Sequence, residues 1–150
     1  VVITHDWLNQ HGISAKLAWW YVHSGWLERL GEKAYKKAGD KIDWTGAIAA
    51  LQTQLHLPIH IGSKTALQLL GRAHFIPQEM KQIILFAPSL TKIPAWLNKP
   101  QLFDSEFILI KTSLFQEQDL GIIERSIEGI NLRLSAPERA AMELLHMVPK

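Results

Sequence analysis

The sequence contains no cysteine, and this absence removes several kinds of chemistry. It excludes disulfide bonds, thiol nucleophiles, iron–sulfur clusters and every zinc site with thiolate ligands. Long apolar runs are missing too, because a run such as residues 83–87 is far shorter than the roughly 20 residues that span a bilayer. The first residues do not resemble a signal peptide. We therefore expect a soluble protein of the cytoplasm with no membrane contact.

A strong excess of one charge is also lacking. Sixteen Lys and Arg against 14 Asp and Glu give a formal net charge of +2, which excludes a histone-like basic chain and an acidic tail protein. The excess lies in residues 1–41, which hold six basic and four acidic residues, whereas residues 42–150 hold ten of each. Any contact with nucleic acid must therefore come from a local patch.

Familiar catalytic motifs are missing as well. There is no Gly-rich phosphate loop, no Gly-x-Ser-x-Gly elbow and no paired-carboxylate motif. His56 and His60 are four residues apart, but Pro58 between them prevents a shared helical face, and no carboxylate stands at zinc-like spacing. The sequence predicts no metal, no cofactor and no enzyme activity.

The 150 residues fit one ordinary domain or two small ones, and 47% hydrophobic residues are enough for a core. Glycines cluster in the first quarter of the chain, which they divide into short pieces. We place a domain boundary near Gly39–Asp43. This gives a first domain over residues 1–41 and a mixed α+β domain over residues 42–150.

The first domain is predicted to be a winged helix-turn-helix. Thr4 is placed to cap a helix that runs to His11, and Ser14 is placed to cap a second helix that runs to Ser24. Rough alternation over residues 27–37, around Gly31-Glu32, predicts a β-hairpin, the wing. Because a winged helix has one further helix before these two, we expect the natural protein to begin earlier than Val1.

The predicted second helix has two unlike faces. At helical spacing Leu17, Ala18, Tyr21 and Val22 share one side, which we expect to face the core. The other side carries Lys16, Trp19, Trp20 and His23. One interpretation is that an indole, Trp20 rather than Trp19, closes over the hairpin as core. The other is that this side enters a DNA groove.

Cations are frequent in the predicted wing. Arg29, Lys33, Lys36 and Lys37 lie on or beside it, directly after the candidate recognition helix. A run of charge is often only a solvated face. Placed here, these residues are predicted to contact phosphates, and each neutralised phosphate adds to affinity and to its salt dependence.

Strands and helices mix in the second region. Asp43 opens an expected helix over residues 44–55, Ser63 caps one that runs to Leu70, and Ser135 caps one that runs to about Met147. Strands are expected over residues 57–61, 81–86 and 107–110, with a hairpin or a single strand over residues 127–134.

Two alternatives from other functional classes remain. A strand, the Gly62-Ser63 turn, a helix and a second strand resemble the entry to a nucleotidyltransferase fold, whose turn positions a nucleotide phosphate. The metal-binding carboxylates of that fold would stand near Gln82 and Ile84, and neither residue can bind a metal as a carboxylate does. This hypothesis therefore includes both an active nucleotidyltransferase and a catalytically inactive relative of that fold. The third hypothesis is a protein-interaction module that docks a partner on its Trp-rich face.

Residues 12–46, together with the later GSKTALQLLGRAHF and SAPERAAMELL segments, resemble the AbiEi-type antitoxin family of type IV toxin–antitoxin, or abortive-infection, systems. The resemblance implies a bacterial protein with an N-terminal winged helix that represses its own operon by binding inverted repeats in double-stranded DNA. It also implies a functional partner, a nucleotidyltransferase toxin, which such antitoxins need not contact directly, and it leaves oligomerisation on DNA open.

Carried over by position, the recognition helix is Ser14 to Ser24 and the wing is Leu27 to Lys37. The predicted DNA-binding residues are Ser14, Lys16, Trp19, Trp20, His23, Arg29, Lys33, Lys36 and Lys37. Two indoles depart from the basic or polar residues expected on a recognition helix, which leaves contact with a sugar or a thymine methyl group as an alternative to reading base edges. Family members also continue beyond the last predicted helix, so we expect a fragment.

Overall fold

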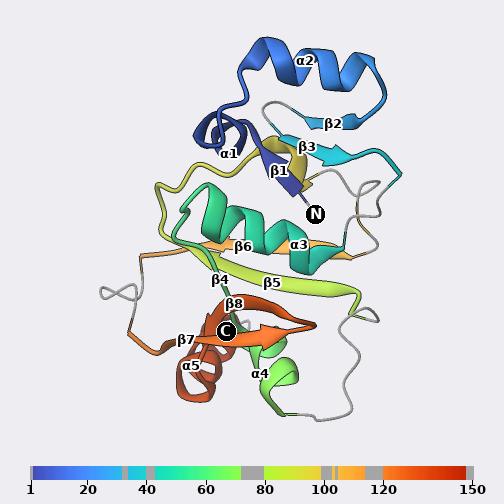
Figure 1. Ribbon diagram of the computed structural model, residues 1–150. Helices are drawn as coiled ribbons and strands as arrows, with labels where there is room; N and C mark the ends of the chain where they lie inside the picture. The colour runs from blue at the N-terminus through green and yellow to red at the C-terminus, as the bar shows by residue number, and fades with distance from the viewer. Residues whose placement is uncertain are drawn as a thin grey trace. The chain divides into compact units, whose positions relative to one another are not determined.

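The computed structural model describes residues 2–31, 34–39, 43–71, 80–98, 103, 105–113 and 120–147. The chain forms two compact units. One comprises Val1–Leu57 with Ile93–Asp104, and the other Pro58–Lys92 with Ser105–Lys150. Figure 1 labels the strands and the α-helices of both units. Mixed α+β architecture, as predicted, describes the chain.

The first unit is built on a three-stranded antiparallel sheet with two short helices. Its first five elements in chain order are β1 (Val2–Thr4), α1 (His5–Gln10), α2 (Ala15–His23), β2 (Leu27–Gly31) and β3 (Ala34–Lys37). The strand order is β1-β3-β2, so β3 is the central strand. The predicted helix, turn, helix and hairpin are all present, and β1 is an additional strand that the sequence did not predict.

Capping residues set the starts of both helices. The side chain of Thr4 accepts a hydrogen bond of 3.2 Å from the backbone N–H of Trp7, and the Ser14 hydroxyl accepts one of 3.2 Å from that of Leu17. Gly12 lies between the helices with φ +78°, a left-handed conformation that favours glycine. Both predicted N-caps are therefore confirmed.

The core of the first unit lies between α1, α2 and the sheet. Leu8, Ala18 and Tyr35 are buried there, with Ile13 and Val22 among the partly buried residues packed against them. Ala18 is fully enclosed, which lets α2 approach the sheet closely. The predicted inner face of α2 is confirmed at Ala18. It is wrong at Leu17, which is 39% exposed because it lies at the edge of the contact.

Residues beyond the predicted domain boundary also belong to this unit. Asp43 caps α3 (Trp44–Ala49) through a 3.0 Å bond from the backbone N–H of Gly46, and the helix continues as the π-helical segment η1 (Ala50–Gln54). The Gln54 amide holds β1, since Oε1 accepts from Thr4 N at 2.8 Å and Nε2 donates to Val2 O at 2.7 Å. The compact units thus divide at other places than residues 41/42. The domain boundary itself remains a prediction.

The short helix η3 (Ala95–Asn98) returns to this unit from later in the chain. Trp96, on this helix, is buried against Gly31 at the end of β2. A Cβ atom on Gly31 would lie 3.0 Å from the Cβ of Trp96, so a side chain there would require Trp96 to shift. Glycine at this position therefore serves close packing.

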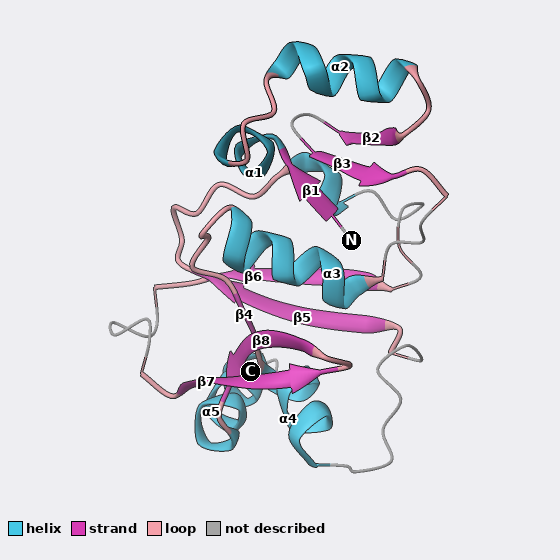
Figure 2. Ribbon diagram, in the orientation of Figure 1, coloured by secondary structure: helices cyan, strands magenta, loops and turns pink. Residues whose placement is uncertain are grey.

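The second unit contains a mixed five-stranded sheet with the order β6-β5-β4-β8-β7. The strands are β4 (His60–Ile61), β5 (Gln82–Ala87), β6 (Glu106–Lys111), β7 (Ile122–Ile127) and β8 (Ile130–Ser135). β4 pairs antiparallel with β5 and parallel with β8. The helices α4 (Ser63–Gly71) and α5 (Pro137–Met147) pack side by side (Figure 2). In the part of the chain that the structure describes, no helix has the length and apolar character needed to cross a membrane.

Of the two alternatives for residues 127–134, the hairpin is confirmed, although its first strand, β7, begins earlier, at Ile122. Three other expectations for this unit need correction. The strand expected over residues 57–61 is only His60–Ile61. Ser63 does not cap α4: it is the first helical residue, with φ +54°, and its buried hydroxyl has no hydrogen-bond partner among the described residues. Ser135 does not cap α5, because it ends β8 and its hydroxyl donates to Glu143.

Candidate nucleic-acid interface

The outer face of α2 is exposed. Trp19 and Trp20 have exposed fractions of 52% and 55%, and Lys16 and His23 on the same face are exposed as well. The interpretation in which one indole closes over the hairpin as core is therefore wrong. The small side chain of Ala18 already fills the contact with the sheet, which leaves no place for an indole.

The aromatic side chains on this face hold one another in place. Trp19 stacks on His23 with ring centroids 3.6 Å apart, and it meets Trp20 edge to face at 5.3 Å. The Nδ1 atom of His23 lies 2.9 Å from the carbonyl oxygen of Trp19, one helical turn earlier, and this bond fixes the imidazole. Aromatic pairs in such geometries are worth about 0.5–1.5 kcal/mol beyond the area they bury. The face is therefore an ordered aromatic surface.

Ser14 stands at the N-terminal end of this face. Its oxygen accepts the capping bond from Leu17 N, and the side chain is exposed. The hydroxyl hydrogen is not used by that bond. Ser14 can therefore donate to a ligand near the start of α2 while it still caps the helix.

The described cations of the hairpin do not all lie on one face of the sheet. Lys36 is half-buried, and its Nζ lies 2.9 Å from Oε2 of Glu28, the residue opposite it on β2. Because side chains alternate along a strand, Lys36 and Lys37 point to opposite faces of the sheet. Arg29 and Lys37 are exposed. Lys33 lies outside the described residues.

The partner of Lys36 is held in its charged form. The Lys36 hydrogen bond, a 3.3 Å bond from the backbone N–H of Gly39 and the Lys36 charge together lower the pKa of Glu28 below its ordinary value. At neutral pH the pair is therefore an ion pair on the hairpin surface. Its positive charge is largely neutralised before any ligand arrives.

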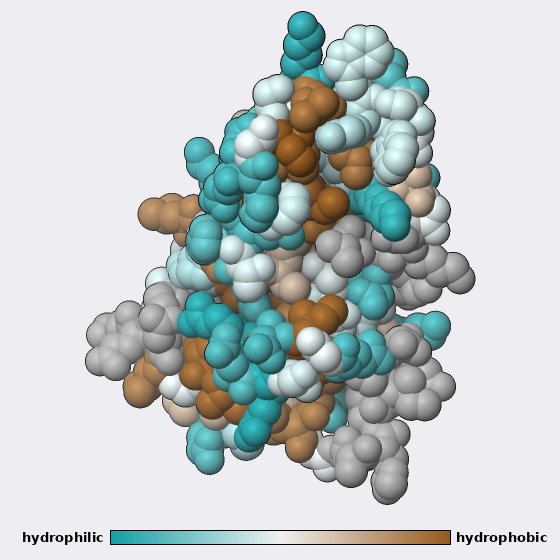
Figure 3. Space-filling model, in the orientation of Figure 1, coloured by the Kyte–Doolittle hydropathy of each residue, from teal (hydrophilic) through white to brown (hydrophobic). Residues whose placement is uncertain are grey.

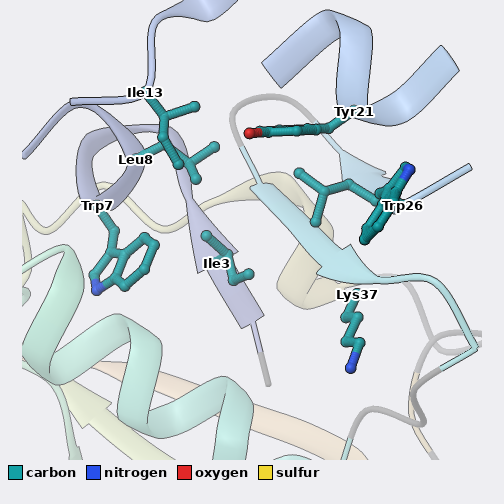
Figure 4. A pocket seen from close by; sticks show the side chains of 8 residues that line it. Ile3, Trp7, Leu8, Ile13, Tyr21, Trp26 and Lys37 are labelled. Carbon is teal, nitrogen blue, oxygen red and sulfur yellow. The ribbon is translucent and has the colours of Figure 1, made fainter. Parts of the chain in front are cut away.

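An apolar pocket of about 510 Å³ opens beside these elements in the first unit. Trp7, Ile13, Tyr21 and Trp26 line it with other apolar side chains, while Lys37 stands at its rim (Figure 4). In the space-filling view, apolar atoms show between α1, α2 and β3 (Figure 3). Sequence patterns missed this pocket because its lining comes from five separate elements.

In the second unit a carboxylate is fully buried. Oε2 of Glu143 accepts a hydrogen bond from His60 Nε2 at 2.8 Å and one from Arg139 Nε at 3.4 Å. Oε1 accepts from the Ser135 hydroxyl at 2.6 Å and from Ser63 N at 3.0 Å. Burial by itself raises the pKa of Glu143, but the bonds from His60 and Ser135, the His60 charge and the Ser63 bond outweigh it and lower the pKa. The group remains ionised in the core.

Sequence reasoning missed this cluster because α5 has an inverted pattern. Its buried positions include Arg139 and Glu143, whereas the exposed positions include Met142 and Leu145. The apolar periodicity of the helix predicts the opposite orientation. Two opposite charges at i and i+4 that flank a small residue, Ala140, are the one local signal of the true buried face.

The Gly62-Ser63 turn gives little support to the nucleotidyltransferase alternative. Glu143 lies at the start of α4, where a nucleotide phosphate was expected, and a Cβ on Gly62 would be 2.5 Å from its Oε1. Gln82 is exposed and Ile84 is buried. Within the described residues, no three His, Asp or Glu side chains gather into a metal-binding group, and the predicted absence of a metal stays a prediction.

These features define a two-unit α+β protein whose first unit presents an ordered aromatic and cationic helix. The chain belongs to the AbiEi antitoxin family of transcriptional regulators. Residues 1–78 match the profile described as "Transcriptional regulator, AbiEi antitoxin N-terminal domain". Residues 80–150 match "Transcriptional regulator, AbiEi antitoxin, Type IV TA system".

Among solved structures the chain is similar to the crystal structure of the Rv2827c protein from Mycobacterium tuberculosis. The TM-score is 0.58 at 15% sequence identity, and the match covers 93% of this chain and 53% of that one. This chain thus spans about half the length of that protein, and the similarity concerns the fold. No curated protein matches the sequence.

Proposed function

We propose that this chain is a DNA-binding antitoxin and autorepressor of a type IV toxin–antitoxin operon, acting in the bacterial cytoplasm without metal or cofactor. The first unit acts as a winged helix-turn-helix, with α2 as the recognition helix and the β2–β3 hairpin as the wing. The operator is double-stranded DNA with inverted repeats. The functional partner is a nucleotidyltransferase toxin that the protein counteracts.

The observation that carries this proposal is the open face of α2. Lys16, Trp19, Trp20 and His23 are all exposed on it, although two large indoles gain nothing from contact with water. Family membership supports the regulatory role. In the proposal this face enters the major groove. The phosphates are contacted by the hairpin cations Arg29, Lys33, Lys36 and Lys37. Lys36 contributes less than the others because it is already paired with Glu28.

The test is binding to the DNA upstream of the protein's own operon. Fluorescence anisotropy of a labelled duplex gives the affinity, and a shuffled duplex of equal length gives the non-specific affinity. We expect a ratio of at least about 10³, the lower end for specific DNA-binding proteins. Equal affinity for both duplexes contradicts autorepression, and failure to bind either duplex contradicts DNA binding altogether.

A second candidate function is a protein-interaction module. The apolar pocket lined by Trp7, Tyr21 and Trp26 favours it, because Trp26 is 69% exposed at its edge. Failure to bind either duplex would favour this candidate. If the wild-type protein binds its duplex specifically and Trp20→Ala abolishes this binding, the aromatic face of α2 contacts DNA and not a protein partner.

A further inference from the structure

A second pocket, of about 380 Å³, lies on the flank of α2 within the first unit. Trp19 and His23 form its wall on the helix side, and Arg29 of β2 and Tyr35 of β3 form the side toward the sheet. His5, the first residue of α1, also lines it. The three consecutive elements α1, α2 and β2 therefore bring two imidazoles and a guanidinium together on one flank of the candidate recognition helix.

The lining of this pocket attracts anions. It includes Arg29, His5 and His23, and none of the described residues that line it is Asp or Glu. Among the described residues Arg29 has no ion-pair or hydrogen-bond partner, whereas Lys36 on the neighbouring strand is paired with Glu28. A guanidinium presents its N–H donors in a planar fork that matches two phosphate oxygens. Arg29 is therefore available to bind an anion in this pocket.

The strand register explains why Arg29 faces α2. Arg29 lies opposite Tyr35 in the β2–β3 ladder, and directly opposite residues share one face of a sheet. Tyr35 belongs to the core beneath α2, so Arg29 points to the same side. The register shifts between Arg29 and Gly31, and a bulge of this kind re-aims neighbouring side chains.

We propose that this pocket holds a backbone phosphate of the bound DNA duplex, with Arg29 as its anchor and His5 as a further donor, while the ring of His23, whose Nδ1–H donates to the Trp19 carbonyl, forms part of the wall. The inference rests on the proposed function. A helix in the major groove lies between two sugar–phosphate backbones, and this pocket is beside α2, on the side of Trp19. The ring of Trp19 provides an apolar wall for the adjoining sugar. The contact fixes the helix in the groove from the flank, in addition to the wing.

The first measurement is the salt dependence of binding to the upstream duplex. Arg29→Gln is expected to weaken binding about tenfold or more, as loss of a charge-assisted hydrogen bond does, and to reduce the slope of log K against log salt by about 0.9. Lys36→Gln is the matched control on the same hairpin, and it should change the slope much less because Glu28 already neutralises Lys36. Arg29→Lys should restore the slope but not the full affinity.

The second measurement identifies the phosphate. A neutral methylphosphonate is placed at each backbone position of the duplex in turn. At one position the replacement should weaken wild-type binding but have no further effect on the Arg29→Gln variant. If the wild-type protein binds while Arg29→Gln keeps the wild-type slope, or if every methylphosphonate affects both proteins equally, this inference is wrong and the proposed function stands. If the wild-type protein binds no duplex, both are wrong.

Discussion

The carboxylate of Glu143 accepts a hydrogen bond of 3.0 Å from the backbone N–H of Ser63, the first residue of α4. The N-terminus of a helix favours a negative charge, because its first N–H groups lack intrahelical partners. In this protein the charge comes from a residue 80 positions later in the chain. The Gly62-Ser63 turn therefore serves an internal ion cluster that joins β4, β8, α4 and α5.

Removing the charge of Glu143 should destabilise the protein. Glu143→Gln keeps the shape of the side chain but leaves Arg139 and His60 without their anionic partner in the core, and we expect the free energy of unfolding to fall by about 3 kcal/mol. Urea denaturation measures the change. The control is Glu138→Gln, an exposed position on the same helix, with an expected change within about 0.5 kcal/mol. Equal effects of the two substitutions would contradict the role given to the cluster.

The lowered pKa of Glu143 predicts a particular pH dependence of stability. A carboxyl whose pKa is lower in the folded than in the unfolded state stabilises the protein above its unfolded-state pKa, and this contribution disappears as the pH falls through the folded-state value. The thermal midpoint of the wild-type protein should therefore decrease as the pH drops below about 4.5, the ordinary value of the group. Glu143→Gln should remove that part of the decrease. Parallel curves for the two proteins would refute the assignment.

Lys36 and Lys37 should contribute unequally to DNA binding. Lys37→Ala should weaken binding to all sequences alike and lower the salt slope, whereas Lys36→Ala should have a smaller effect because of the Glu28 pair. Glu28→Gln provides the inverse experiment, since it removes the charge that neutralises Lys36 and should strengthen binding a few-fold at low salt. A weaker complex for Glu28→Gln would show that the pair supports binding through the hairpin structure.

The outer face of α2 should determine sequence preference. Lys16→Ala is expected to change the preference by about 1–3 kcal/mol at one base pair. Trp20→Ala should reduce specific binding with little loss of stability, since Trp20 is 55% exposed. Replacing thymine by deoxyuridine, which removes only the methyl group, tests whether an indole reads that group. If neither variant alters binding to operator or shuffled DNA, α2 is not the recognition helix.

Gln54 should matter for the first unit although it lies outside the predicted DNA-binding domain. Gln54→Ala removes both hydrogen bonds to β1 and leaves the two backbone groups unsatisfied unless water reaches them, at a cost of about 1–3 kcal/mol. Thr53→Ala, at an exposed neighbouring position, is the control. Hydrogen exchange of the β1 amides measures the effect. Unchanged protection would support a domain that ends near residue 41.

The local elements of the first unit follow from residues that are close to one another in the chain. Thr4 and Ser14 define helix starts because a hydroxyl that accepts from a nearby backbone N–H acts within four residues. The helical period places Ala18 on the inner face of α2 and Trp19 on its outer face. This too could be predicted, because the period of a helix depends only on neighbouring residues.

Which charged groups are available to a ligand depends on contacts between distant parts of the chain. The pairing of Lys36 with Glu28 depends on the register of β2 and β3, and the same register decides which face of the sheet Arg29 lies on. In α5 the burial of Glu143 is the reverse of the orientation that the apolar pattern of the helix predicts. Burial and ion pairing depend on groups that folding brings together from distant parts of the chain, so the local spacing of residues cannot predict them.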